Sequence, residues 1–163
     1  MAGVKILKIV SGGQTGADRA ALDFALENGL EIGGFVPKDR FAENGRIPDK
    51  YQNLIETETV DPAERTELNV VHSDATLIIS HGELSGGSAQ SEQLALRYKK
   101  SVLHTDLNKQ QLADAVKLAS NWLTANDIRT LNIAGPRISE DAEIYASVMS
   151  FLRLLFADIV GHR

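Results

Sequence analysis

The sequence predicts an α/β fold in three layers, with a mostly parallel sheet of about five strands and helices on both faces. Short β-branched runs alternate with longer segments of helical periodicity, which is typical of βαβ units. Glycine-rich segments follow two of the predicted strands. The chain has 163 residues, of which 43% are hydrophobic, enough for one sizeable core. We therefore expect residues 1–163 to form a single domain.

The expected elements follow one another along the chain. Strands are predicted at 5–10, 31–36, 75–80, 102–105 and 130–134, with a short extended piece at 53–58. Helices are predicted to begin after each glycine segment and to end near residues 28 and 99, and to cover 61–72, 109–124 and 140–159. The apolar stripe of the last helix faces the core or in part a second subunit, and we favour the core.

The amino-acid composition restricts the classes of molecule that the chain is expected to bind. Seventeen Lys and Arg against 22 Asp and Glu give a net charge of -5, which argues against a general nucleic-acid or membrane-surface binder. The chain has no cysteine, so disulfides and thiolate metal sites are excluded. The four histidines lack metal-site spacing, and no Ser-His-Asp set can be ordered from sequence. No signal peptide or membrane span is recognisable. We expect a cytoplasmic protein with a small-molecule partner and no metal.

The first glycine segment, SGGQTGADRA at residues 11–20, joins a strand to a helix. Helix N-termini favour anions, and glycine lets a phosphate approach closely. The segment is neither a P-loop nor a dinucleotide fingerprint. A tight turn with Thr15 as cap is the alternative, and we favour the anion site. Asp18 would hold a ribose hydroxyl or amine, and Arg19 a phosphate or a carboxylate of its own fold. The candidates are Gly12, Gly13, Gln14, Thr15, Gly16, Asp18 and Arg19.

The second glycine segment follows the strand at 75–80 and supplies small hydroxyls as well as amides. Its candidates are Ser85, Gly86, Gly87 and Ser88. In a parallel sheet every strand ends at the same edge, where ligands bind. We expect the two segments to lie at the ends of adjacent strands and to form one pocket for a small, anionic, phosphorylated ligand.

Other polar residues leave two interpretations open. Arg137, in AGPRIS at 134–139, reaches the same anion, or the segment is a turn with Ser139 as a helix cap. Arg65 and Asn69 are four residues apart and share one face of a predicted helix. This face points either to the site or to solvent, and we favour the interpretation that it faces solvent. His81 and His104 follow strands and are expected to be structural or exposed. The loop at 37–49 contains three basic residues, Lys38, Arg40 and Arg46. They would either close over a ligand or face water, and facing water is the more usual case.

Four stretches, SGGQTGADRAALDFA, ERTELNVVHSDATLIIS, LSGGSAQSEQLA and LNIAGPR, together resemble the molybdenum carrier family, relatives of the algal molybdenum cofactor carrier protein. The resemblance covers nearly the whole chain in the right order. It implies membership of the Rossmann-like superfamily that includes lysine decarboxylase-like proteins and cytokinin-activating phosphoribohydrolases. It also implies a doubly wound fold, a phosphate or nucleotide-type ligand at the glycine loops, and homo-oligomers, either dimers or tetramers. The implied cargo is molybdenum cofactor, a phosphorylated pterin with dithiolene-bound molybdenum.

One departure from the superfamily bears on catalysis. The phosphoribohydrolase pattern is Pro-Gly-Gly-x-Gly-Thr-x-x-Glu, whereas this chain reads SGGSAQSEQ over residues 85–93. Gln93 stands in place of the catalytic glutamate, and a neutral amide cannot act as acid or base. Replacement by Glu92 would require its side chain to turn by about 100° around the helix. Catalysis is therefore disfavoured, and the residues to consider if the chain is an enzyme are Glu92, Asp18 and Glu83.

The leading hypothesis is a binding protein that holds a phosphorylated pterin- or nucleotide-like molecule at two glycine-rich helix N-termini, with molybdenum cofactor as the cargo by resemblance. The alternative is a nucleotide hydrolase that cleaves an N-glycosidic or phosphate bond. A third possibility is a nucleotide-sensing subunit.

Overall fold

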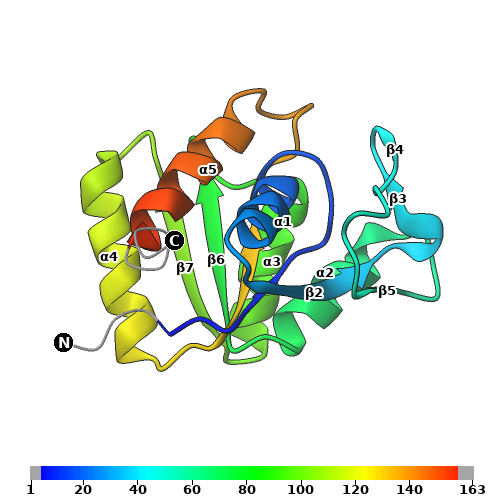
Figure 1. Cartoon of the computed structure of the whole chain (residues 1–163), viewed down its shortest axis with the longest axis horizontal. Coiled ribbons are helices and arrows are strands. Elements are labelled where there is room, and N and C mark those ends of the chain that lie inside the picture. Colours follow the sequence, from blue (N-terminus) through cyan, green and yellow to red (C-terminus); the bar gives the residue numbers. More distant parts are fainter. Residues whose placement is uncertain (1–4, 158–163) are drawn as a thin grey trace.

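The computed structural model describes residues 5–157, in which six strands form one sheet in the order β5-β2-β1-β8-β6-β7 (Figure 1). Every neighbouring pair in this sheet is parallel. The strands are β1 (Lys8–Val10), β2 (Glu31–Val36), β5 (Leu54–Glu56), β6 (Ala75–Ser80), β7 (Ser101–Asp106) and β8 (Thr130–Ala134). The α/β prediction is confirmed, with six strands rather than five, because the extended piece at 53–58 pairs with β2 as an edge strand.

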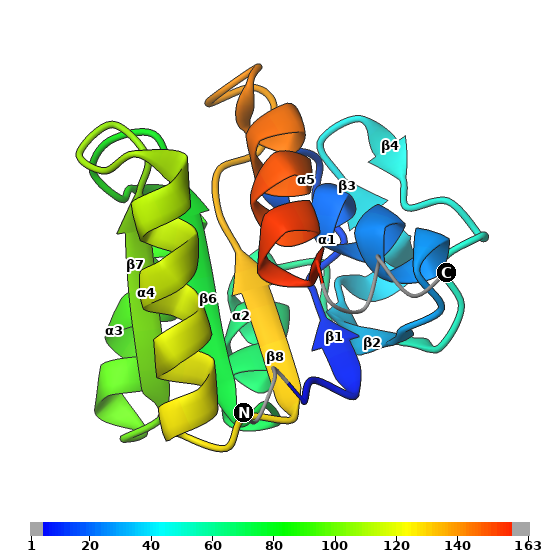
Figure 2. The ribbon, with the colours of Figure 1, turned by 60° about the vertical axis from the view of Figure 1, so that its left-hand side comes forward.

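Five α-helices cover the two faces of the sheet and complete the three layers (Figure 2). They are α1 (Ala17–Glu27), α2 (Pro62–Val71), α3 (Gly86–Arg97), α4 (Leu112–Ala125) and α5 (Ile144–Leu155). Helices α1, α4 and α5 pack side by side on one face, whereas α2 and α3 pack together on the other. This doubly wound arrangement brings the carboxyl ends of all six strands to one edge of the sheet.

The core explains why these segments adopt these elements. All six residues of β6 are buried, as expected for a central strand covered on both faces. Helix α1 presents small side chains to the sheet, and α5 contributes the apolar stripe that the sequence placed in the core. Phe24 and Phe156 join these two helices with ring centroids 5.5 Å apart. Each such buried side chain contributes about 1.5–3 kcal/mol of transfer free energy.

Three predicted boundaries were wrong for local reasons. Strand β1 begins at Lys8, three residues later than expected. Helix α4 begins at Leu112 because Asp106 first closes a turn, in which its carboxylate accepts from Asn108 N–H at 2.9 Å. Helix α5 begins at Ile144 because residues 137–143 form turns. The predicted end of that helix at residue 159 lies outside the described residues.

The segment between β2 and β5 folds back as a hairpin of two short antiparallel strands, β3 (Phe41–Ala42) and β4 (Gly45–Arg46), preceded by a 3-10 turn, η1 (Lys38–Arg40). Arg40 is buried and donates to the carbonyl oxygens of Ile47, Pro48 and Tyr51. Neither interpretation of Arg40, as a ligand-closing or a water-facing residue, was correct. Lys38 and Arg46 are exposed.

No helix within residues 5–157 is both long enough and apolar enough to cross a membrane.

Candidate functional site

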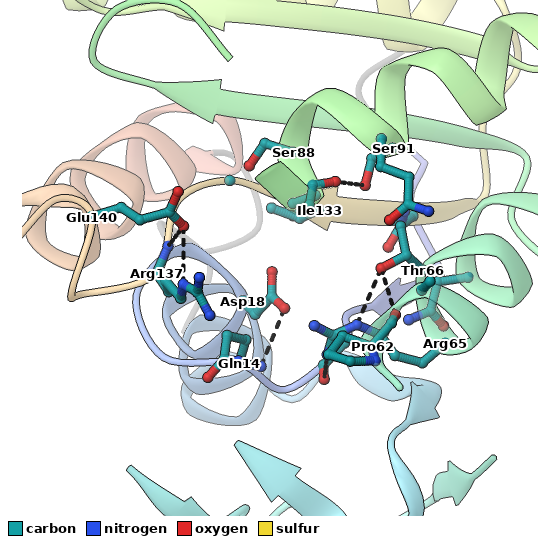
Figure 3. Close-up of a pocket in the computed structure, with 18 of the residues that line it drawn as sticks. Gln14, Asp18, Pro62, Arg65, Thr66, Ser88, Ser91, Ile133, Arg137 and Glu140 are labelled. Carbon is teal, nitrogen blue, oxygen red and sulfur yellow. Dashed lines mark hydrogen bonds and ion pairs between the residues drawn. The ribbon is translucent and has the colours of Figure 1, made fainter. Parts of the chain in front are cut away.

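A cavity of about 280 Å³ opens at the carboxyl edge of the sheet (Figure 3). Four segments line it: the β1–α1 loop, one side of α2 with its N-cap, the N-terminal turns of α3, and the end of β8 with the loop after it. This volume lies just below the usual range for small-molecule pockets, about 300–1,000 Å³. The first and second glycine segments both reach this cavity.

The two glycine segments do not follow adjacent strands, contrary to the prediction from sequence. Strand β8 lies between β1 and β6 and pairs with both. The segments nevertheless meet, because α1 and α3 lie on opposite faces of the sheet (Figure 2) and the end of β8, which lies between β1 and β6, lines the same cavity as both segments. Six of the predicted residues line the cavity: Gly12, Gln14, Asp18, Gly87, Ser88 and Arg137. The other six do not: Gly13, Thr15, Gly16, Arg19, Ser85 and Gly86.

Three backbone amides of the first loop, those of residues 13–15, are bonded to side chains of the same segment. Gly13 N–H donates to Ser11 Oγ at 3.2 Å, and Gln14 N–H donates to Asp18 Oδ2 at 3.2 Å. Thr15 N–H donates to Gln14 Oε1 at 3.0 Å. Gly16 has φ of +80°, and a Cβ there would lie 2.5 Å from the Pro136 carbonyl oxygen. These glycines therefore serve the turn and its packing.

Thr15 and Arg19 hold the hairpin to this loop. The N-cap of α1 is Gly16, so Thr15 is not the cap that the turn alternative required. Thr15 Oγ1 instead donates to Glu43 and accepts from Ile138 N–H at 3.1 Å. Arg19 donates to the Gly13 carbonyl at 3.1 Å and to Asn44 Oδ1 at 3.0 Å. Its guanidinium thus binds neutral oxygens of the fold.

The N-terminus of α3 is open toward the cavity. Ser85 is its N-cap but makes no side-chain capping bond. The N–H groups of Gly86, Gly87 and Ser88 have no hydrogen-bond partner among residues 5–157. A Cβ added at Gly87 would meet nothing within 4 Å. Free amides and the positive end of the helix dipole therefore coincide with open space, which is the arrangement that favours an anion.

Asp18 points into the cavity from α1 (Figure 3). Burial raises its pKa to about 6, an effect that the nearby Arg65 charge and the hydrogen bond from Gln14 N–H partly oppose. One carboxylate oxygen accepts from Gln14, which leaves the other directed at the cavity. Asp18 is thus a buried acid that changes charge near neutral pH.

Arg65 and Asn69 of α2 are buried, so the solvent-facing interpretation was wrong. Arg65 donates to the Gly12 carbonyl at 2.5 Å and to Thr66 Oγ1 at 3.2 Å, and burial lowers its pKa. Asn69 bonds both the N–H and the carbonyl of Phe35, at 2.7 and 3.0 Å. Hydrogen bonds to backbone groups of Gly12 and Phe35 thus hold the Arg65 and Asn69 side chains in place. Both residues line the cavity.

Arg137 stands at the mouth of the cavity with its side chain half exposed. Its Nε lies 3.3 Å from Glu140 Oε1 and 3.6 Å from Glu43 Oε2. Ser139 does not cap α5, because its hydroxyl donates to Glu43 Oε2 at 2.5 Å and the helix begins five residues later. The segment is therefore both a turn and a source of one cation beside the cavity.

The residues named for a hydrolase are not gathered in one place. Glu83 and Glu92 border a different cavity, together with Gln93 and His104. On α3, Gln90 and Ser91 face the first cavity and the next two residues face the second. Asp18 is thus the only one of the three candidate acids at the first cavity. His104 is structural, with Nε2 2.7 Å from Ser80 Oγ.

The part of the chain that the structure describes holds no group of three or more His, Asp or Glu side chains placed to bind a metal ion.

Residues 9–156 match the model of the circularly permutated YpsA SLOG family. The chain belongs to this family. A crystal structure at 1.45 Å resolution, titled "Putative molybdenum carrier protein", from Syntrophus aciditrophicus, is 52% identical to the chain. The alignment covers 94% of this chain and 97% of that one, with a TM-score of 0.93. No curated protein matches the chain. The resemblance to molybdenum carriers is confirmed.

This YpsA SLOG member also lines its cavity with residues that sequence reasoning missed, among them Asn132, Ser91 and Glu140. Asn132 is buried on β8 and donates to Thr76 Oγ1 at 3.2 Å. A signal for it was present, because an asparagine inside an apolar strand needs a polar neighbour. Ser91 and Glu140 carried no comparable signal, since both depend on how α3 and the β8–α5 loop are placed.

Proposed function

We propose that this chain binds a phosphorylated pterin- or nucleotide-like molecule in the cavity at the carboxyl edge of the sheet, and that its cargo is molybdenum cofactor. The observation that carries the proposal is the open N-terminus of α3, where Gly87 and Ser88 have free amides and line a cavity that also contains Arg137. A phosphate placed there would receive backbone hydrogen bonds and one charge-assisted contact.

Asp18 supports the second half of the proposal, recognition of the ring. Pterins and guanine share an edge with adjacent ring N–H and amino donors, and one carboxylate oxygen has two lone pairs with which it can accept from both. Asp18 directs an oxygen at the cavity from the side opposite α3 (Figure 3). The chain has no cysteine, so the metal would keep the sulfur ligands of its own cofactor. The name of the 52% identical neighbour supports this choice of cargo.

The test is to identify what the protein carries when it is made in cells that synthesise molybdenum cofactor. We expect native mass spectrometry to show a bound phosphorylated pterin, and elemental analysis to show molybdenum in proportion to it. A matched pair of variants at Gly87 tests the site. Gly87→Asp adds a negative charge at the end of α3, where the fold has room for it, and should lose the cargo. Gly87→Asn has the same size without the charge and should keep it.

A cargo retained equally by both variants would exclude the α3 N-terminus as the phosphate site. A protein that carries no pterin but retains a nucleotide would leave the site in place and change the cargo. The same spectra report the subunit number, for which we expect a homodimer or homotetramer.

One observation favours a second candidate, a nucleotide hydrolase. Asp18 has a pKa of about 6 in the cavity and would therefore supply a proton near neutral pH. In this alternative Asp18 would protonate the leaving base of a nucleoside monophosphate. Incubation with nucleoside monophosphates, followed by chromatography of free base, separates the two functions. Base release that disappears in Asp18→Asn would support the hydrolase, and its absence would support the carrier.

A further inference from the structure

A second cavity, of about 320 Å³, lies away from the proposed ligand site, between the loop after β6, the start of α4 and helix α5. Its polar residues include His81 and Ser147, and its apolar residues are Leu107, Leu112 and Ala146. None of these residues lines the cavity that contains Asp18.

His81 is bonded at both ring nitrogens. Nδ1 lies 2.6 Å from Asp141 Oδ2, and Nε2 lies 3.1 Å from Ser147 Oγ. The Asp141 carboxylate is held in turn, because its other oxygen accepts from Glu143 N–H at 2.9 Å. A carboxylate at Nδ1 fixes the proton on that nitrogen and leaves the lone pair of Nε2 for the serine hydroxyl. Asp141, His81 and Ser147 are therefore connected in the order that activates a serine.

One feature of the surroundings favours chemistry at Ser147, and a second favours a bound molecule in the same cavity. It lies in the first turn of α5, where the positive end of the helix dipole favours negative charge developing on Oγ. Gln110 borders the same cavity, and its Oε1 is shielded from solvent without a hydrogen-bond partner among residues 5–157. This oxygen can only accept, so a hydrogen-bond donor on a bound molecule would satisfy it.

We propose that Ser147, His81 and Asp141 form a nucleophilic site that cleaves esters of short apolar carboxylic acids, independent of the carrier function. Ser147 Oγ attacks the ester carbonyl carbon while its proton passes to His81 Nε2. The carbon–oxygen bond to the alcohol breaks, and His81 returns the proton to the departing oxygen. A water molecule then attacks the acyl-serine by the same route, which releases the acid and restores the hydroxyl. Asp141 is a positioning residue that holds the ring and its tautomer.

The test uses p-nitrophenyl acetate with the full chain. We expect release of p-nitrophenol together with one acetyl group located on Ser147 by peptide mapping. Ser147→Ala should remove that acetyl group, and His81→Gln should slow acetylation by about 10²-fold or more, since a general base contributes about 10²–10⁴-fold. Asp141→Asn should lower the rate of acetylation and move its pH profile, which loss of packing alone would not do.

Ser150→Ala is the matched control, because Ser150 lies on the same helix and borders the same cavity without a bond to His81. It should react as the unmodified chain does. Acetylation confined to lysines, or a rate unchanged in Ser147→Ala, would overturn the proposal and leave the three residues as a structural link between β6 and α5. Circular dichroism of each variant distinguishes lost reactivity from lost folding.

Discussion

Asp18 is the residue whose protonation should control ligand choice. A carboxylate that accepts from two donors must be ionised, and the Asp18 pKa is about 6. Guanosine monophosphate has both donors, whereas inosine monophosphate lacks the amino group. We expect the ratio of their dissociation constants to favour the guanine nucleotide more strongly as the pH rises through about 6. Titration calorimetry measures the ratio, in which the titration of the shared phosphate cancels. A ratio independent of pH would place the ring away from Asp18.

The same side chain should leave a signature in stability. Its pKa rises from 3.8, the ordinary value for an aspartate in water, to about 6 in the fold, because the fold favours the protonated form. The resulting contribution of Asp18 to the free energy of unfolding is fully present below pH 3.8 and is lost as the pH rises through 6. The shift corresponds to about 3 kcal/mol. Asp18→Asn stays neutral and should not lose this free energy. Urea unfolding at a series of pH values from about 4 to about 7 measures the free energy of unfolding. This free energy should change less with pH in Asp18→Asn than in the unmodified chain, whereas the exposed Asp127→Asn should behave as the unmodified chain does.

At the scale of elements, Glu43 is the residue that fastens the β3–β4 hairpin to the rest of the site. It accepts from the hydroxyl of Thr15 and from both the N–H and the hydroxyl of Ser139. These bonds join the hairpin to the β1–α1 loop and to the β8–α5 loop. Although burial opposes ionisation, the hydrogen bonds from Ser139 and Thr15 hold the Glu43 pKa below its usual range.

Glu43→Ala should therefore loosen the β3–β4 hairpin and the β8–α5 loop together. We expect faster amide hydrogen exchange over residues 41–46 and at Ile138 and Ser139, with α1 unchanged. Glu31→Ala, at an exposed position at the start of β2, is the control and should leave these rates as they are. Faster exchange in Glu31→Ala as well would mean that the hairpin responds to general destabilisation rather than to Glu43.

Elements with a strong local signal were predicted well, and those fixed by distant contacts were not. The glycine that ends α1 and the cap of α2 are local: Asp61 accepts from Ala63 N–H at 2.9 Å, as its position before Pro62 indicates. The roles of the first-loop amides were not predicted, although their partners, Ser11 Oγ and the Asp18 carboxylate, lie only two and four residues away along the chain. The residue pattern does not show toward which donors these side chains turn. Sequence therefore located this loop without predicting which of its donors are free.

At the scale of the molecule, strand order was the step that sequence did not supply. Strand β8 comes last along the chain yet pairs with β1 and β6 at the centre of the sheet. Pairing between residues 8 and 130 depends on the packing of every intervening helix, which periodicity does not encode. The glycine segments were correctly predicted to share a pocket, but the reason is the crevice above β8 rather than adjacency of their strands. That same central position brings Asn132 and Arg137 to the site.

Because the cavity is assembled from segments across the whole chain, ligand binding should stabilise the fold globally. A ligand at about 100 times its dissociation constant adds about 2.7 kcal/mol to the free energy of unfolding. For a domain of this size that raises Tm by about 5–10 °C. We expect guanosine monophosphate to produce this rise in the unmodified chain and in Gly87→Asn. Gly87→Asp should have an equal or higher Tm without ligand, because aspartate suits a helix N-terminus, and should respond little to the nucleotide. An equal response in both variants, measured by differential scanning calorimetry, would mean that the phosphate binds away from α3.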